Sequence, residues 1–486
     1  MTTLLLTQIP VWAGVVLVVY WIAVLIFLVD QDREPTSTLA WLFVLLSLPF
    51  LGVLFYYFFG RDWRERTARS KWAPQAVALM KKGMAPVYER NLAAEQRFQD
   101  AFAGTWVEDI SKAIAVDNFS HPLTARSVEI YGLTADFFAR LKRDLAGARS
   151  FIHLQYFIWE MDELTAEITQ ILLERVAAGV EVRILYDNLG SRAYRKDELT
   201  RLAQAGAQVT ADVVERAQLN YRDHRKVTVI DGEIGYTGGS NMGQEYIDGG
   251  ERFASWRDTN IRITGQAVAE LQKLFASRWY LDREGEDLLV ERYFPAPDGH
   301  VAHAGHLTQL VAHTHEGLWQ ASRRAHMIAI AKAEKTAFIQ SPYFIPDAGM
   351  YDAMINAGLS GVDIRFMMAG VPDKRVPFWA AQTYFGRLLA AGVRVYLYEA
   401  GFTHAKTITV DSTVSAVGTM NLDIRSMHLH KELMLWLFDE GLTRELEDLF
   451  LDDVTRCHEV TVADVRAVSR RERFRNQGCR LLSNLL

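Results

Sequence analysis

The chain has 486 residues, of which 50% are hydrophobic and 23% are charged, and this composition excludes an intrinsically disordered protein. Its length corresponds to roughly two to three domains. A net charge of −6 gives no electrostatic reason to expect a nucleic-acid partner. Two cysteines, Cys457 and Cys479, are too few for a disulfide framework or a cysteine-based zinc site.

The first sixty residues predict a pair of membrane-spanning helices. No charged side chain occurs in residues 1–29, and a second uncharged stretch covers residues 36–60. A helix rises about 1.5 Å per residue, so either stretch is long enough to cross a hydrocarbon core about 30 Å thick. A cleaved signal peptide would need a basic start and a short apolar core, and both are missing. We expect spans at about 8–29 and 38–59 within a hairpin of residues 1–60, rather than a buried helix pair of a soluble core.

The charges that flank these stretches predict the orientation of the chain. The connection between them is acidic overall, with Arg33 as its one basic residue. Seven basic residues follow the second stretch, namely Arg61, Arg64, Arg66, Arg69, Lys71, Lys81 and Lys82. Because positively charged segments stay in the cytosol, we expect the remainder of the chain on the cytoplasmic side. Residues 61–112 are interpreted as a basic juxtamembrane linker that either lies on an anionic lipid surface or forms an ordinary solvated helix.

The remainder of the chain is interpreted as a duplicated unit. Four features recur in the same order: a buried strand (151–158 and 337–346), a second strand after a glycine (180–186 and 362–367), a third apolar run (after Gly206 and Gly392) and a His-x-Lys triplet. A repeated order at nearly constant spacing predicts two halves, residues 113–297 and 298–486. Strands that alternate with helical segments predict an α/β sandwich in each half.

Each repeat ends in the same polar motif, H-x-K-x4-D-x6-G-x-x-N. The first copy contains His224, Lys226, Asp231 and Asn241, and the second, 180 residues later, contains His404, Lys406, Asp411 and Asn421. A single His-x-Lys triplet is uninformative, whereas two full copies with identical internal spacing are a strong signal. The motif therefore marks the candidate catalytic residues of both halves.

The spacing within the motif has a structural interpretation. Residues two apart on a strand share a face, so the histidine and lysine of each copy are expected to point the same way. Each aspartate lies seven residues after its histidine, an odd offset, and Asp231 is followed by Gly232 in a hairpin-turn pair. Although Asp231 and Asp411 belong to the catalytic motif, we expect them to hold the turn and the backbone rather than to touch substrate.

The duplicated motif resembles that of the phospholipase D superfamily, and nearly the whole chain is similar to its bacterial cardiolipin synthases. The similarity includes residues 33–52, 341–347 and 421–426. It implies two duplicated phospholipase D-like α/β sandwich domains that form one pseudo-twofold body, preceded by the transmembrane hairpin in a bacterial inner membrane. The chain departs from the family after Ser426, where His430-Lys431-Glu432 replaces Asn-Phe-Glu.

Two imidazoles that face one phosphodiester permit a two-step displacement. One neutral histidine attacks phosphorus while the other, protonated, donates to the leaving alkoxide, and an alcohol activated by the second histidine then resolves the phosphohistidine. The resemblance implies that His224 is the nucleophile and His404 the acid and base. Asp258 and Glu432 are candidates to orient the imidazoles, with a surface strand charge as the alternative for each.

Four further motif residues are expected to neutralise the phosphoryl oxygens: Lys226, Lys406, Asn241 and Asn421. Metal ions perform this task in other phosphoryl-transfer enzymes, so we expect neither a metal nor another cofactor. A cluster of histidines (His300, His303, His306, His313 and His315) is the rival candidate for a metal site, and we interpret it as a polar loop instead.

Three functions are compatible with these features. We favour a transferase that condenses two phosphatidylglycerol molecules into cardiolipin and glycerol. The alternative is a membrane-bound phospholipase D that releases phosphatidic acid by hydrolysis. A nuclease of the same superfamily is disfavoured by the apolar N-terminal stretches and by the sequence pI of about 6.1.

Overall fold

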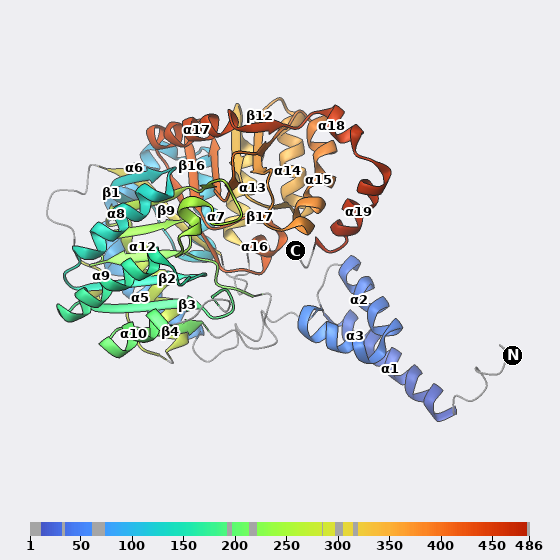
Figure 1. The fold of residues 1–486 in the computed structure, drawn as a ribbon, viewed down its shortest axis with the longest axis horizontal. Helices are drawn as coiled ribbons and strands as arrows, with labels where there is room; N and C mark the ends of the chain where they lie inside the picture. Colours follow the sequence, from blue (N-terminus) through green and yellow to red (C-terminus); the bar gives the residue numbers. More distant parts are fainter. Residues whose placement is uncertain are drawn as a thin grey trace. The chain divides into compact units, whose positions relative to one another are not determined.

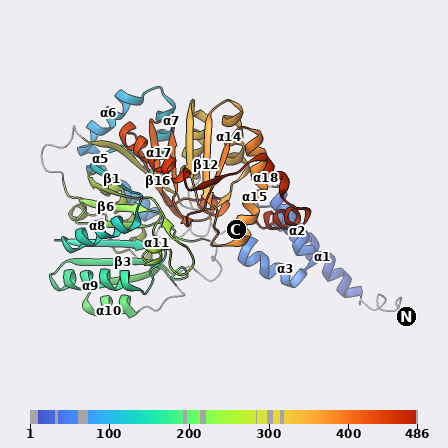
Figure 2. The same ribbon diagram turned by 45° about the horizontal axis from the view of Figure 1, so that its top comes forward.

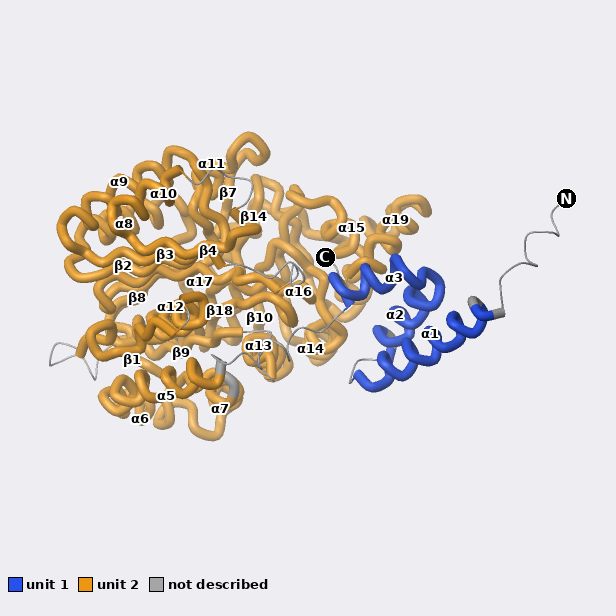
Figure 3. Tube along the Cα trace, turned by 90° about the horizontal axis from the view of Figure 1, so that it is seen from below, with its two compact units in different colours: residues 1–65, 215–220 blue, residues 66–214, 221–486 orange. Residues whose placement is uncertain are grey.

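A computed structural model describes residues 11–31, 35–60, 73–191, 197–212, 221–283, 285–296, 305–313 and 319–483 (Figure 1). The chain divides into two compact units, shown in different colours in Figure 3. The small unit comprises residues 1–65 and 215–220, and the large unit comprises residues 66–214 and 221–486.

The small unit is helical. It contains α1 (Val11–Val29), α2 (Pro35–Ser47), α3 (Pro49–Phe55) and a π-helical turn, η1 (Tyr56–Gly60). The second predicted span is thus interrupted after Leu48, because the proline that follows lacks the N–H that would continue the helical hydrogen bonds. The hydroxyl of Tyr20 ties α1 to this break, since it donates to the carbonyls of Leu45 and Pro49 at 3.1 Å each.

Apolar side chains cover much of the surface of the small unit. Phe43 is 73% exposed and Phe50 is 93% exposed. Within the described ranges, no helix has both the length and the apolarity that a membrane crossing needs. The two predicted spans remain a prediction, and the residues that the orientation argument used between 61 and 71 lie outside the described residues.

A single mixed sheet of 15 strands organises the described part of the large unit. The first half contributes, in spatial order, β1 (Leu123–Tyr131), β8 (Asn260–Gly265), β6 (Ile234–Gly238), β5 (Val227–Ile230), β2 (Phe151–Tyr156), β3 (Glu181–Asp187) and β4 (Gln208–Asp212). The second half contributes β9 (His306–His313), β18 (Glu432–Leu437), β16 (Val414–Gly418), β15 (Thr407–Val410), β10 (Thr336–Gln340), β12 (Asp363–Ala369), β13 (Arg394–Tyr398) and β19 (Cys457–Glu459). The first seven strands of each half follow the same order, and the halves join where β1 pairs with β9. A strand is found at each of the six predicted places, although β2 ends at Tyr156 and β10 at Gln340, before the predicted ends at residues 158 and 346.

Helices cover both faces of this sheet, as Figures 2 and 3 show. Those of the first half are α8 (Thr134–Ala146), α9 (Glu163–Ala177), α10 (Asp197–Ala205), α11 (Glu245–Asp248) and α12 (Val268–Asp282). Those of the second half are α13 (Ala321–Lys332), α14 (Ala348–Leu359), α15 (Arg375–Ala390), α16 (Ile424–His428) and α17 (Glu440–Val454). Two further helices, α18 (Val462–Ala467) and α19 (Arg470–Arg480), pack against α15. The result is the predicted α/β fold.

One cluster of buried apolar side chains crosses from the first half to the second. It includes Phe275 and Trp279 of α12 together with Leu435 and Leu437 of β18. All four are at most 1% exposed. Because burial of such side chains stabilises a fold by about 1.5–3 kcal/mol each, the two halves are held together as one body.

The sequence predicts a juxtamembrane linker over residues 61–112, but their described part belongs to three helices of the large unit. From Ala73 onward it forms α5 (Ala73–Arg90), α6 (Leu92–Phe102) and α7 (Trp106–Asn118). Phe98 and Ile110 are fully buried in the core of the large unit. The apolar faces of these helices therefore pack on protein, and the predicted start of the first half at residue 113 lies inside α7. The predicted boundary at 297/298 lies outside the described residues.

The structure contradicts the prediction of a polar loop for part of the histidine cluster. His306 and His313 begin and end β9, a strand that pairs on both sides, so the loop interpretation is wrong for these two. His300, His303 and His315 lie outside the described residues. In the part of the chain that the structure describes, no group of three or more histidine, cysteine or acidic side chains is arranged to hold a metal ion.

The two motif aspartates anchor the backbone at equivalent places in the two halves. The carboxylate of Asp231 accepts hydrogen bonds from three consecutive backbone N–H groups, those of Arg149, Ser150 and Phe151, at 2.7–2.9 Å. The carboxylate of Asp411 accepts three equivalent bonds from Glu334, Lys335 and Thr336 at 2.7–2.9 Å. Each aspartate thus binds the start of the strand, β2 or β10, that lies beside its own hairpin.

We predict that Asp231→Ala lowers the free energy of unfolding of the large unit by about 1–3 kcal/mol, because three backbone donors lose a charged acceptor. Asp231→Asn should cost less, since asparagine keeps an acceptor oxygen and tolerates the left-handed backbone at this position, where φ is 54°. Urea unfolding measures both effects. A variant of full stability that had lost its activity would instead place Asp231 in the chemistry.

Candidate active site

The two motif histidines are held by the main chain of the opposite half. The N–H of His224 donates to the carbonyl of Lys431 at 2.9 Å, and the N–H of His404 donates to the carbonyl of Arg257 at 2.7 Å. Each histidine lies three residues before a central strand, β5 or β15. The site can therefore form only when both halves are in contact.

The side chains of these histidines are oriented in the same crossed manner. Nδ1 of His224 lies 3.1 Å from both carboxylate oxygens of Glu432, which belongs to the second half. Nδ1 of His404 lies 2.8 Å from Oδ2 of Asp258, which belongs to the first half. Both carboxylates are fully buried. Since Nδ1 is engaged in each ring, Nε2 is the nitrogen left for the substrate.

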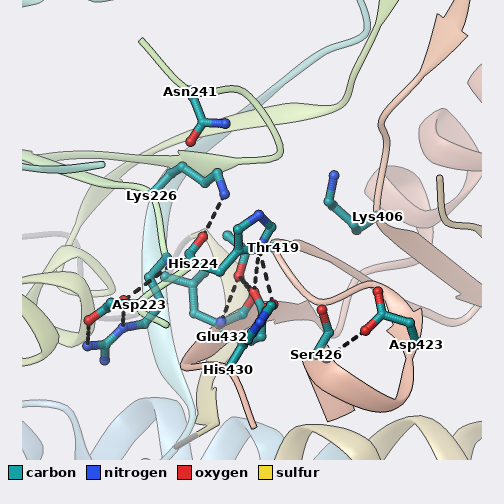
Figure 4. A network of polar contacts seen from close by, with 12 residues as sticks. Asp223, His224, Lys226, Asn241, Lys406, Thr419, Asp423, Ser426, His430 and Glu432 are labelled. Atoms are coloured by element: carbon teal, nitrogen blue, oxygen red, sulfur yellow. Dashed lines mark hydrogen bonds and ion pairs between the residues drawn. The ribbon is translucent and has the colours of Figure 1, made fainter. Parts of the chain in front are cut away.

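The turn of each motif supplies a hydrogen bond to the carboxylate, and in the first motif a glycine also makes room for it. A Cβ atom on Gly239 would lie 2.0 Å from Oδ1 of Asp258, so only glycine permits this approach. Ser240 donates to Asp258 at 3.3 Å. In the second half, Thr419 donates to Oε2 of Glu432 at 2.5 Å, and Figure 4 shows this contact next to the imidazole of His224.

Both histidines are neutral in the unliganded site at pH 7. Burial, reinforced by the nearby ammonium groups of Lys226 and Lys406, lowers the pKa of His224 well below its usual range. Burial and Lys406 also lower the pKa of His404, to about 4, although Asp258 opposes this shift. One imidazole is thus ready to act as a nucleophile, and the other must gain a proton to act as an acid.

The two motif lysines reach into the same region from the two halves (Figure 4). Nζ of Lys226 donates to the carbonyl of His224 at 2.6 Å, and Nζ of Lys406 donates to the carbonyl of His404. Burial lowers the pKa of Lys226 to about 7 and that of Lys406 to about 8, even though buried carboxylates partly compensate. An anion bound beside these amines would favour their charged forms.

A cavity of about 590 Å³ lies between the histidines, within the range of about 300–1,000 Å³ that is typical of ligand sites. His224, His404, Asn241 and Asn421 all line it. The amide nitrogen of Asn241 donates to the hydroxyl of Tyr246 at 2.9 Å, which fixes the orientation of its side chain.

The structure sorts the predicted site residues into four groups. Lys226 and Lys406 donate to the carbonyls of the motif histidines, and the described lining of the cavity does not include them. The histidines and asparagines line the cavity, whereas Asp258 and Glu432 lie behind the histidines. Asp231 and Asp411 follow β5 and β15, whereas the histidines precede these strands, so the two aspartates lie at the opposite strand ends and are not placed among the catalytic groups.

Sequence reasoning missed several residues that line the cavity, among them Arg222, Arg425, His430, Trp256, Tyr343 and Phe402. For three of these residues, the spacing from a predicted site residue could have indicated their position. Arg222 and Phe402 lie two residues before a motif histidine, and His430 lies two residues before Glu432, so the alternation of an extended chain could have assigned them to the same face.

Comparison with known proteins identifies the family of this chain. A family described as "Cardiolipin synthase, PLD-like domain" matches residues 141–279 and 327–454, one segment in each half. A second family, "Phospholipase_D-nuclease N-terminal", matches residues 10–61. The chain is 35% identical to a cardiolipin synthase of Geobacillus thermodenitrificans over 94% of this chain and 90% of that protein. It is 34% identical to the major cardiolipin synthase of Bacillus subtilis over 95% and 96%.

Solved structures share the fold at low sequence identity. A phosphatidylserine synthase of Haemophilus influenzae superimposes with a TM-score of 0.59 and 13% identity, over 79% of this chain and 100% of that one. A polyphosphate kinase of Porphyromonas gingivalis superimposes with a TM-score of 0.50 and 13% identity, over 72% and 54%. The family model matches a segment in each half, and relatives of this family match over nearly the whole chain. The two motif copies also meet in one cavity. The chain therefore belongs to the cardiolipin synthase family of phospholipase D-like proteins.

Proposed function

We propose that this chain is a phosphatidyltransferase that condenses two phosphatidylglycerol molecules into cardiolipin and glycerol. The observation that carries the proposal is the pair of imidazoles on one cavity, each oriented by a buried carboxylate of the opposite half. The names of the relatives that match over nearly the whole chain favour this transfer over the alternative, hydrolysis to phosphatidic acid.

In the first step, Nε2 of His224 attacks the phosphorus of the donor lipid. The bond between phosphorus and the glycerol head group breaks, and His404 gives its proton to the departing oxygen. A bound phosphodiester anion raises the pKa of His404, so the acid takes up its proton as the substrate binds. Lys226 and Lys406, with Asn241 and Asn421, stabilise the negative phosphoryl oxygens.

In the second step, the primary hydroxyl of a second phosphatidylglycerol attacks the phosphohistidine. His404, now neutral, accepts the proton of that hydroxyl, the P–N bond to His224 breaks and the new P–O bond completes cardiolipin. Water competes for the same intermediate. Orientation of the lipid hydroxyl can contribute several kcal/mol, which is enough to outcompete unpositioned water.

We propose further that the small unit anchors the enzyme in the membrane as a two-helix hairpin, with the large unit on the cytoplasmic side. The largely exposed apolar side chains of α1 to α3, Phe43 and Phe50 among them, support this proposal. External protease should leave the large unit intact in whole spheroplasts and digest it after lysis. Digestion before lysis would contradict the orientation.

Product analysis tests the proposed reaction. Purified full-length protein that receives only phosphatidylglycerol in bilayers should release glycerol and cardiolipin in equal amounts, with phosphatidic acid as a minor product. Mass spectrometry of the lipids together with an enzymatic glycerol assay measures the ratio. Phosphatidic acid as the main product, in bilayers without detergent, would establish hydrolysis instead.

We predict that His224→Ala and His404→Ala each abolish turnover and that the double variant is little worse than either single one, because the two residues act as a unit. Initial rates of cardiolipin formation measure this, and circular dichroism controls for folding. If one histidine alone proved essential, the shared site would be disproved.

The pH–rate profile should be bell-shaped, and the crossed carboxylates predict that each one controls a different limb of it. Asp258→Asn removes the charge that stabilises protonated His404, so the pKa of the acid falls and the alkaline limb should move to lower pH by about one unit. Glu432→Gln should act on His224 in the same way and move the acid limb to lower pH. Movement of the same limb in both variants would refute the assigned roles.

A further inference from the structure

The cavity has two walls that are built from equivalent positions of the two halves. Arg222 and Phe402 lie two residues before their motif histidines, and Arg425 and Glu245 lie four residues after their motif asparagines. All four line the cavity. The duplicated fold thus offers a direct comparison of the two walls, one beside His224 and one beside His404.

The main chain confirms that these positions are equivalent. Beside His404, the two-residue strands β14 (Phe402–Thr403) and β7 (Trp256–Arg257) run parallel, with Phe402 opposite Trp256. Beside His224, a parallel bridge joins Asp223 to Lys431. The residues one position earlier, Arg222 and His430, therefore correspond to the aromatic pair of the other wall.

The wall beside His404 is aromatic. The ring centroid of Trp256 lies 4.8 Å from that of Phe402 and 5.4 Å from that of His404, and Phe253 packs 4.9 Å from Phe402. Glu245 and Arg252 also line the cavity, and the guanidinium carbon of Arg252 lies 5.2 Å from the ring centroid of Phe253, so this wall carries charges of both signs. Such a surface fits an uncharged glyceryl group better than a second phosphate.

The wall beside His224 is cationic. Arg222 lies over the ring of Phe157, with its guanidinium carbon 5.5 Å from the ring centroid, and pairs with Asp187. Arg425 also lines the cavity, and its buried Nε has no hydrogen-bond partner among the described residues. The charge of Arg425 acts on the nearby carboxylate of Asp423, but no ion pair within the described residues joins the two. A guanidinium with an unused donor on a cavity wall is suited to an anionic ligand.

The backbone holds the two arginines next to each other. The N–H of His430 donates to the carbonyl of Arg425 at 2.8 Å, and the N–H of Lys431 donates to the carbonyl of Arg222 at 2.7 Å. Burial and the charge of Arg425 together lower the pKa of Arg222 to about 10. Two like charges kept this close repel each other, and a bound anion would relieve that repulsion.

We propose that Arg425, with Arg222 and His430, binds the phosphodiester of the second, acceptor phosphatidylglycerol. This inference depends on the proposed function, because cardiolipin carries two phosphates. One phosphate lies between the histidines during transfer, and the other needs a cationic site of its own. Water and free glycerol carry no phosphate, so this subsite selects a phospholipid as the acceptor.

Two rates measured on the same enzyme test the subsite. The first is cardiolipin formation from phosphatidylglycerol bilayers, and the second is incorporation of isotopically labelled glycerol into phosphatidylglycerol. Both reactions use the same donor and the same phosphohistidine, but the acceptor of the second reaction is neutral. Arg425→Gln should lower cardiolipin formation at least ten-fold more than glycerol exchange.

Arg375→Gln is the matched control, because Arg375 also lines the cavity, at the exposed start of α15. It should leave the ratio of the two rates unchanged. An equal fall of both rates in Arg425→Gln would overturn the subsite, since Arg425 would then serve the donor or the fold. The same change of ratio in both variants would also overturn it. If the unmodified enzyme performed neither reaction, the proposed function itself would fail.

Discussion

The site depends on two contacts between the halves, in each of which a carboxylate of one half binds the motif histidine of the other half. Asp258 reaches across to His404 over 146 residues of sequence, and Glu432 reaches back to His224 over 208. Neither half alone could keep its histidine in a defined tautomer and orientation, because the group that does so belongs to the other half. The apolar cluster between α12 and β18 is therefore as necessary for chemistry as for stability.

Burial gives these contacts their strength. Asp258 and Glu432 are fully buried, as are both lysines to within 1%. Removing four ionisable groups from water is costly, and mutual attraction offsets that cost only when all four are present in the right geometry. Burial lowers the pKa of the lysines to about 7 and about 8, so the attraction of the buried carboxylates offsets only part of the cost of desolvation. In the proposed reaction, the phosphoryl group of the lipid supplies the negative charge that offsets the rest of this cost.

Duplication supplied a symmetric scaffold, and substitution then made its two sides different. The order of the first seven strands and the spacing of the motif recur in both halves, so the two motif histidines are equivalent in position. The flanking positions have diverged to Arg222 and Arg425 on one side and to Phe402 and Glu245 on the other. A reaction between two molecules of the same lipid needs such asymmetry, because donor and acceptor must be bound differently.

The sequence by itself determined the duplication, the α/β class, the strand pairs and the motif histidines, lysines and asparagines. These features follow from local patterns: apolar runs, alternation along strands and a motif repeated with identical spacing. The sequence also indicated that Asp231 and Asp411 hold backbone, since an odd offset places them off the face of the histidines. Only the tertiary structure decided which carboxylate meets which histidine, because that pairing lies between residues far apart in the chain. It alone decided that α5 to α7 pack on protein, since an amphipathic helix has the same period whether its apolar face meets a core, a bilayer or water.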